Sequence, residues 1–323
     1  MGYEAGDTIT AAQYNIFVNN SSAPFGYNHF AGTGEDQYGL GQTHIATVAG
    51  GNDNATTITA SQFNTLLTGI DTIANHTNDT MTARTSVAAG DTIAIKSNLE
   101  ADLATLAASV AAGCTSATAL TTSSALQTVT SSSEGWDTSA TQEVSITFAS
   151  ADAMRHFFNA GGKVRITQGT TQASTSPKDQ SYIDMGTAIG NLDIASQATT
   201  RSGSGETLTT NGLANGFHDL GTGYTTLIKL TSDNSQYTSN TVEISAKLNA
   251  AVGSSTVMTV KVVATDGAAD NQYTSPNTSG VAADIKDTPK IVTTLKTLNP
   301  NDTEGLASTI APSATATVSN STS

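Results

Sequence analysis

The histidines and the cysteine are the side chains whose chemistry is easiest to recognise from spacing. No histidine stands at metal-ligand spacing from another histidine or from the cysteine, and the HExxH and CxxC patterns are absent. The sequence therefore predicts no metal site and no cofactor. The cysteine has no partner for an intrachain disulfide and is expected to be a small buried residue. The residues considered are His29, His44, His76, His156, His218 and Cys114.

Patterns for nucleophilic catalysis and phosphate binding are missing as well. The chain contains no GxSxG nucleophile elbow and no GxxxxGK[ST] phosphate loop, and its acidic residues are scattered without a marked pair. Residues 266–271 offer several oxygen ligands, but they lack the distal glutamate and the ligand spacing of a calcium loop. An acidic turn is the favoured interpretation there. These observations predict that the protein is not an enzyme.

Aromatic side chains leave a binding role open. Trp136 is the only tryptophan, and it is interpreted as a core or interface anchor rather than a platform for stacking a sugar. Tyr237 and Tyr273 fall in or beside expected loops, where exposed aromatic rings can bind glycans or proteins.

An internal repeat organises the N-terminal third. The segment GDTITAAQYN at residues 6–15 recurs as ATTITASQFN at residues 55–64, and a weaker copy, AGDTIA, lies at residues 89–94. In the two longer copies, threonine stands three residues before glutamine, which is the spacing of a helix capping box. Helices are therefore expected to begin near each cap. The repeat residues proposed as structural or interface candidates are Thr10, Gln13, Tyr14, Thr59, Gln62 and Phe63.

Apolar residues after each repeat step by three or four, as on one face of a helix. These stripes predict three short amphipathic helices, and the last should stop at Gly113. Because only one face of each helix is apolar, each needs a partner. The helices either pack against one another or dock onto another protein. The three stripes are Tyr14, Phe17 and Val18; Phe63, Leu66, Leu67, Ile70 and Ile73; and Ile95, Leu99, Leu103, Leu106 and Val110.

The pattern changes to a period of two beyond residue 140. Val144–Phe148 alternates as a half-buried strand, and Ser150 is expected to cap a helix over residues 151–159. Gly161 and Gly162 should end that helix, and a strand follows at residues 163–167. The helix carries Phe157 and Phe158, which are expected to differ sharply on truncation, with at least one of them in the core.

Further strands are expected at residues 182–185, 224–230, 241–248 and 256–264, the last two forming a hairpin. Residues 168–180 and 196–212 are interpreted as long polar loops. Residues 114–140 are interpreted as a Ser/Thr-rich linker, and residues 266–323 as an extension and tail that is either disordered or laid over a neighbour.

Composition narrows the class of protein. The 323 residues include 12% charged residues, with 13 Lys and Arg against 27 Asp and Glu and a net charge of −14. A nucleic-acid binder needs clustered cations, so none is expected as a partner. No membrane-spanning run and no signal peptide is apparent. A large surface with dilute charge favours a subunit that buries much of it against copies of itself.

Residues 146–165, ITFASADAMRHFFNAGGKVR, resemble a signature of tail-fibre-like virion structural proteins of contractile-tailed bacteriophages, including phages of cyanobacteria. The N-terminal Gly-Asp-Thr-Ile repeats, YGLGQ at 38–42, IANH at 73–76 and YTSNTVEI at 237–244 are similar to that family in style. The resemblance covers residues 1–265. It departs at His156, at Lys163 and in the extension after Ala264. It implies a particle component assembled in the host cytoplasm and located in the virion.

These inferences combine into one expectation. The fold is α+β and β-rich, with a helical repeat module at 1–113 that anchors the chain, a linker at 114–140, a mostly antiparallel β domain with one short helix at 141–265, and an extension at 266–323. The function is structural, in the tail, fibre, baseplate or neck of a phage particle, through contacts with copies of itself and other virion proteins. The alternative is an adhesin that recognises host surface glycan or protein through the loops at 168–180 and 196–212.

Overall fold

The computed structural model describes residues 10–23, 25–31, 43–49, 58–77, 79–83, 85–89, 96–111, 120–123, 126–130, 136, 138–159, 161–171, 173, 177–234, 237–268, 289–299 and 317–322. The chain divides into two compact units, with a boundary in the sequence between residues 120 and 121, and residues 155–161 group with the first. Its helices and antiparallel sheets confirm the α+β, β-rich class.

The first unit is helical. It contains α1 (Ala11–Asn19), α2 (Tyr27–Phe30), α3 (Ala60–Thr77) and α4 (Lys96–Ala111). The described connecting segments, 43–49, 79–83 and 85–89, have no regular secondary structure. The helices α1, α3 and α4 correspond to the three predicted helices. The short helix α2 was not predicted. It follows a break at Pro24, where the sequence shows only turn residues.

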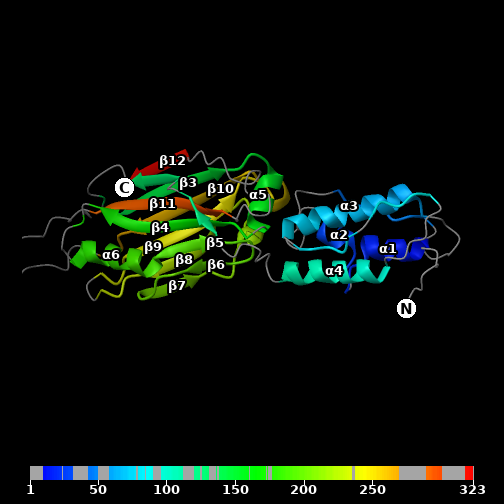
Figure 1. Cartoon of the computed structure of the whole chain (residues 1–323). Coiled ribbons are helices and arrows are strands. Elements are labelled where there is room, and N and C mark those ends of the chain that lie inside the picture. The colour runs from blue at the N-terminus through cyan, green and yellow to red at the C-terminus, as the bar shows by residue number, and fades with distance from the viewer. Residues whose placement is uncertain are drawn as a thin grey trace, which may run out of the picture. The chain divides into compact units, whose positions relative to one another are not determined.

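The second unit is a β-sandwich (Figure 1). Within the described residues, one six-stranded sheet has the order β1-β11-β4-β5-β6, with β2 also paired to β11, and the other has the order β12-β3-β10-β9-β8-β7. The strands are β1 (Thr121–Thr122), β2 (Gln127–Thr130), β3 (Ser139–Thr147), β4 (Lys163–Thr171), β5 (Asn191–Ile194), β6 (Thr199–Arg201), β7 (Thr207–Asn211), β8 (Thr225–Thr231), β9 (Thr241–Leu248), β10 (Val257–Thr265), β11 (Lys290–Asn299) and β12 (Thr317–Thr322). Two 3-10 turns, Phe217–Asp219 and Val252–Ser254, lie between strands.

Alternating burial along the strands places the core between the two sheets. Every second residue of β3, β10 and β11 is buried, as a strand with one covered face requires. A buried glutamine joins the sheets: the Gln142 amide of β3 donates to the carbonyls of Ile291 at 2.9 Å and Val129 at 3.3 Å. Thr293 of β11 donates its hydroxyl to the Gln142 amide oxygen. The polar group is therefore satisfied inside an apolar core.

Helices α5 (Ala151–Asn159) and α6 (Pro177–Ile189) follow β3 and β4 in the chain. The bounds of α5 agree with the prediction, but α6 corrects two others. Residues 182–185 were predicted as a strand and lie in this helix, and the expected loop at 168–180 contains the end of β4 and the first turn of α6. Helix α6 contacts β4 of one sheet and β9 of the other. The expectation of one short helix beyond residue 140 was therefore wrong.

Three other segments are more ordered than predicted. The expected loop at 196–212 contains β6 and β7, and the expected linker at 114–140 contains β1, β2 and the start of β3. The expected tail after residue 265 contains β11 and β12, and β11 pairs with β4 over nine residues. The β domain therefore does not end at residue 265. The predicted β9–β10 hairpin is confirmed by its antiparallel pairing from Met258–Leu248 to Thr265–Thr241.

Candidate functional site

Capping threonines begin α1 and α3 as the repeat predicts. The Thr59 backbone N–H donates to the Gln62 side chain at 3.0 Å, and the Thr59 hydroxyl accepts from the Gln62 N–H at 3.2 Å, which completes a capping box. At α1 only the glutamine half is within hydrogen-bond limits, since the Thr10 N–H donates to Gln13 at 3.0 Å while the Thr10 hydroxyl is buried without a partner among the described residues. Both copies of the repeat therefore begin a helix at the same position. The second copy has both capping hydrogen bonds, and the first has only the one to the glutamine side chain.

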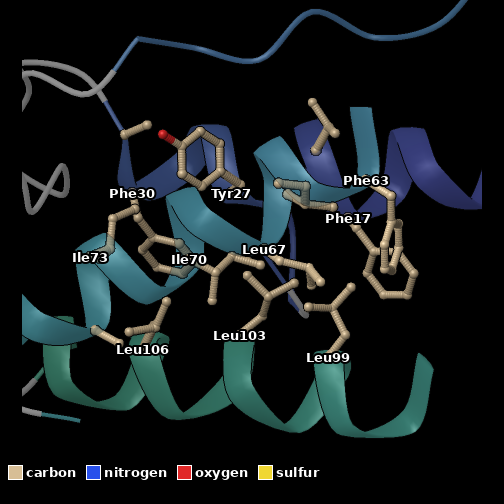
Figure 2. Packing of buried hydrophobic residues seen from close by; sticks show 14 of the residues in the cluster. Phe17, Tyr27, Phe30, Phe63, Leu67, Ile70, Ile73, Leu99, Leu103 and Leu106 are labelled. Carbon is tan, nitrogen blue, oxygen red and sulfur yellow. The ribbon is translucent and has the colours of Figure 1, made fainter. Parts of the chain in front are cut away.

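The aromatic residue of each repeat is a core residue of the helical unit. Tyr14 is fully buried and donates its hydroxyl to the Gln62 carbonyl at 3.2 Å, so the first copy of the repeat bonds to the second. Phe63 is 1% exposed. As Figure 2 shows, leucines and isoleucines of α3 and α4 point toward one another, with Phe30 of α2 beside them. The apolar stripes therefore pack mutually, and these two aromatic side chains are not available on the surface of the unit.

Three asparagines, here called the clamp asparagines, hold extended segments against the helices. Asn15 of α1 donates to the Val48 carbonyl at 3.0 Å and accepts from the Val48 N–H at 2.8 Å. Asn64 of α3 makes the same pair of bonds to Val87, both at 2.9 Å. The third clamp asparagine, Asn28 of α2, donates to the Ile45 carbonyl and accepts from the Ile45 N–H, both at 2.8 Å.

The sequence contains a signal for two of the clamp asparagines. Asn15 and Asn64 occupy the same position, the last, in both copies of the ten-residue repeat. A primary amide carries a donor and an acceptor side by side, so it can satisfy both backbone groups of one extended residue. The repeat therefore encodes a cap at its fifth position and a clamp at its tenth. The partner valines could not be foreseen because they lie far along the chain.

Replacing Asn64 by alanine is expected to lower the free energy of unfolding by about 1–2 kcal/mol, because both backbone groups of Val87 lose their partner. Urea unfolding measures the change. The matched control is Asn98→Ala on α4, whose exposed side chain should leave the stability nearly unchanged. Equal stability of the Asn64→Ala variant and the wild type would contradict the clamp.

An open depression of about 660 Å³ lies along α3. Thr65 and Thr72, in its floor, donate their hydroxyls to helix carbonyls four residues earlier, so these groups are already used. The lining contains no ionisable side chain other than the Tyr27 phenol, and it therefore suggests no acid–base chemistry. It consists of Tyr27, Thr43, Ile45, Ser61, Asn64, Thr65, Thr68, Gly69 and Thr72.

The segment that carries the phage resemblance is the end of β3, helix α5 and the start of β4. The Ser150 hydroxyl accepts from the Ala153 N–H at 3.1 Å and so caps α5, as predicted. Phe157 and Phe158 are both fully buried, and their rings meet edge to face at 5.1 Å. Gly161 ends the helix with a φ of 88°, which explains a glycine there, and Gly162 is buried beside it.

Trp136 lies in the core of the β-sandwich. It is 1% exposed, its indole N–H donates to the Pro289 carbonyl at 3.1 Å, and its ring meets Tyr182 of α6 edge to face at 5.1 Å. A platform for stacking a sugar must be accessible, so the core interpretation of this residue applies. Phe157, Phe158 and Trp136 are therefore buried packing residues, and Gly161 and Gly162 form the turn between α5 and β4.

The outer face of the β3–β10–β9–β8 sheet carries a tyrosine ring between two lysines. Tyr224, just before β8, has the Lys247 ammonium 4.4 Å and the Lys261 ammonium 4.0 Å from its ring centroid. Both distances are typical of cation–π contacts. Burial, and next the neighbouring Glu143 carboxylate, raise the pKa of the Tyr224 phenol above its ordinary value. We call Tyr224, Lys247, Lys261 and Glu143 the tyrosine cluster.

The raised pKa predicts loss of stability in alkali. Burial also raises the pKa of Tyr14 and Tyr27. A phenol whose pKa is higher in the folded state contributes its full stability below the unfolded value of about 10, and loses it as the pH rises toward the folded value. Urea unfolding at pH 7 and at about pH 10.5 should therefore show a fall. Tyr224→Phe should fall less than the wild type, and an equal fall in both proteins would contradict the assignment.

No group of histidine, cysteine and acidic residues among the described residues is placed to hold a metal ion. No helix in the described part of the chain is both long and apolar enough to cross a bilayer. No protein-family model, curated protein or solved structure matches this chain.

Proposed function

We propose that this protein is a structural component of a tailed bacteriophage particle that assembles through protein–protein contacts. The observation that carries the proposal is the conformation of residues 146–165, the segment with the phage resemblance. Its large apolar side chains are buried: Ile146, Phe148, Met154, Phe157, Phe158 and Val164. The resemblance therefore rests on residues that shape a strand–helix–strand element, as is expected of a shared scaffold rather than a shared catalytic site.

The architecture supports a role in assembly. Strand β12, from the far C-terminal part of the chain, forms one edge of its sheet and pairs with β3 over six residues. A sheet edge that can accept a separate strand is a common place for chains to join. The outward-facing residues of both sheets are mostly serine, threonine and single charges, which is typical of wet, polar protein–protein contacts.

The test of the proposal is the location of the protein. Particles encoded by the same genome should contain the chain when they are purified and digested for mass spectrometry, and gold-labelled antibody should mark one place on them. The purified protein should scatter light as a homo-oligomer at micromolar concentration. Purified particles that lack the chain would overturn the proposal, whatever the oligomeric state of the isolated protein.

One observation favours the adhesin as a second candidate. The tyrosine cluster puts an aromatic ring and two cations on an outer sheet face, a combination suited to acidic glycans. The loops first considered for this role contain regular structure instead, so the sheet face replaces them as the binding surface. Lys247→Glu with Lys261→Glu should abolish binding of the protein to host cells, whereas Lys296→Glu on the other sheet should not. Cell binding that survives the first pair of changes would exclude this face.

A further inference from the structure

A buried ion pair joins α6 to the end of β10. The Lys178 ammonium lies 2.7 Å from Oδ2 of Asp266, and the two side chains are only 4% and 2% exposed. Lys178 is in the first turn of α6, and Asp266 is the first residue after β10. Charges are rarely withdrawn from water so completely, because each loses several kcal/mol of hydration. The pair therefore needs an explanation beyond surface electrostatics.

Surrounding groups hold Asp266 in one orientation. Its other oxygen, Oδ1, accepts from the Ala268 N–H at 3.1 Å, which leaves Oδ2 facing the lysine. The preceding residue, Thr265, accepts a hydrogen bond from the Tyr182 hydroxyl at 3.2 Å. The following residue, Gly267, donates its N–H to the buried Asn240 side chain at 3.1 Å. The residues directly before and after Asp266 are thus both held by hydrogen bonds, and these fix the position of its carboxyl group.

The backbone of Lys178 is held by neighbouring polar groups. The Ser181 hydroxyl donates to the Lys178 carbonyl at 2.7 Å and accepts from Asn240 at 3.1 Å. The Tyr182 ring packs against Trp136, so aromatic carbon lines this part of the core. At 4% and 2% exposure, the two reacting groups are almost completely withdrawn from water. Fixed orientation and desolvation are the two conditions that accelerate a reaction between neighbouring groups.

We propose that Lys178 and Asp266 join in an intramolecular isopeptide bond. The proton in the ion pair passes from Nζ to Oδ2, which gives a free amine and a carboxylic acid. The amine lone pair attacks Cγ of Asp266, the atom bonded to Oδ2, and a C–N bond forms. The C–O bond to the protonated oxygen breaks, the nitrogen gives up a second proton, and one water molecule leaves. No external reagent takes part.

Such a bond would be a covalent cross-link within the chain, in the role that a disulfide has in other proteins. The sequence has a single cysteine, so no disulfide can form within it. Segments far apart in sequence, the start of α6 and the end of β10, would become permanently connected. The residues that follow β10 would then be linked covalently to α6 by a bond that neither denaturant nor reductant breaks.

Mass spectrometry of the denatured full-length protein tests the proposal. The mass should be lower than the sequence mass, allowing for the initiator methionine, by one water. Protease digestion should release one branched peptide that contains both residue 178 and residue 266. Lys178→Arg and Asp266→Ala should each restore the sequence mass, and this readout does not require the variants to fold. The matched control is Lys229→Ala, which removes a lysine that is about one-third exposed and paired with Glu243 at 3.4 Å. The mass of this variant should still be one water below its sequence mass.

A wild-type protein with the full sequence mass and two separate peptides would overturn the proposal and leave an ordinary ion pair. A mass deficit that persists in Asp266→Ala would overturn it equally, because the water would then have come from other groups. Neither outcome bears on whether the protein is a particle component, so the two proposals fail independently.

Discussion

Alanine in place of Phe157 or Phe158 is expected to lower the free energy of unfolding by about 3–5 kcal/mol in each case. Both rings are fully buried and contact each other edge to face at 5.1 Å. Each truncation removes the hydrophobic contribution of a phenyl ring and leaves a cavity in a densely packed interior. Chemical denaturation monitored by circular dichroism measures the change.

The structure corrects one part of the earlier expectation. The sequence predicted that the two variants would differ sharply, with at least one of the two rings in the core. Since both rings have zero exposure, similar losses are now expected. The matched control is Ile16→Ala on α1, where the isoleucine is 51% exposed and the change should be small. A neutral effect at both phenylalanines would refute the packing of α5.

Removal of Asp266 is expected to have the second large effect. Asp266→Ala leaves the Lys178 ammonium buried without its partner, and breaking a buried ion pair in this way costs about 3–5 kcal/mol. If the two residues are joined by the proposed isopeptide bond, the loss is at least as large, because the covalent link is lost as well. The same substitution at Glu243, whose pair with Lys229 is about one-third exposed, should cost about 1 kcal/mol or less. Urea unfolding of the two variants side by side gives the comparison.

A double variant separates charge burial from other effects of the substitution. Lys178→Met with Asp266→Asn removes both charges and keeps an oxygen that can accept from the Ala268 N–H. It should be more stable than Asp266→Ala, because no unpaired charge remains buried. If Asp266→Ala is no less stable than the wild type, the buried pair contributes nothing to the fold. Raised salt should change the Asp266→Ala effect little, because buried pairs are weakly screened.

Local features of the fold followed from the sequence. The Thr59 and Gln62 capping box, the bounds of α5 and the β9–β10 hairpin were predicted from residues a few positions apart. Caps and short turns depend on hydrogen bonds between near neighbours, and the period of apolar residues shows which face will be covered. These features could be derived because their partners are visible within one short window.

Helix α6 shows where local reasoning failed. Residues 182–185 were predicted as a strand from a short apolar run, which a buried helix can also contain. The polar residues around the run concealed the helix, because Lys178 and Ser181 appear suited to solvent. Their burial is possible only because Asp266 and Asn240 come from distant parts of the chain.

The sequence by itself determined which segments are helical or extended in the repeat and around residues 139–171, and which residues cap them. Tertiary structure decided what those segments meet: the clamp asparagines find their valines, β11 enters the centre of a sheet, and Trp136 turns into the core. The same holds for chemistry. Spacing along the chain showed no reactive pair, whereas the fold places the Lys178 ammonium nitrogen 2.7 Å from Oδ2 of Asp266. Strand pairing and the burial of polar groups depend on partners distant in sequence, so only the folded chain specifies them.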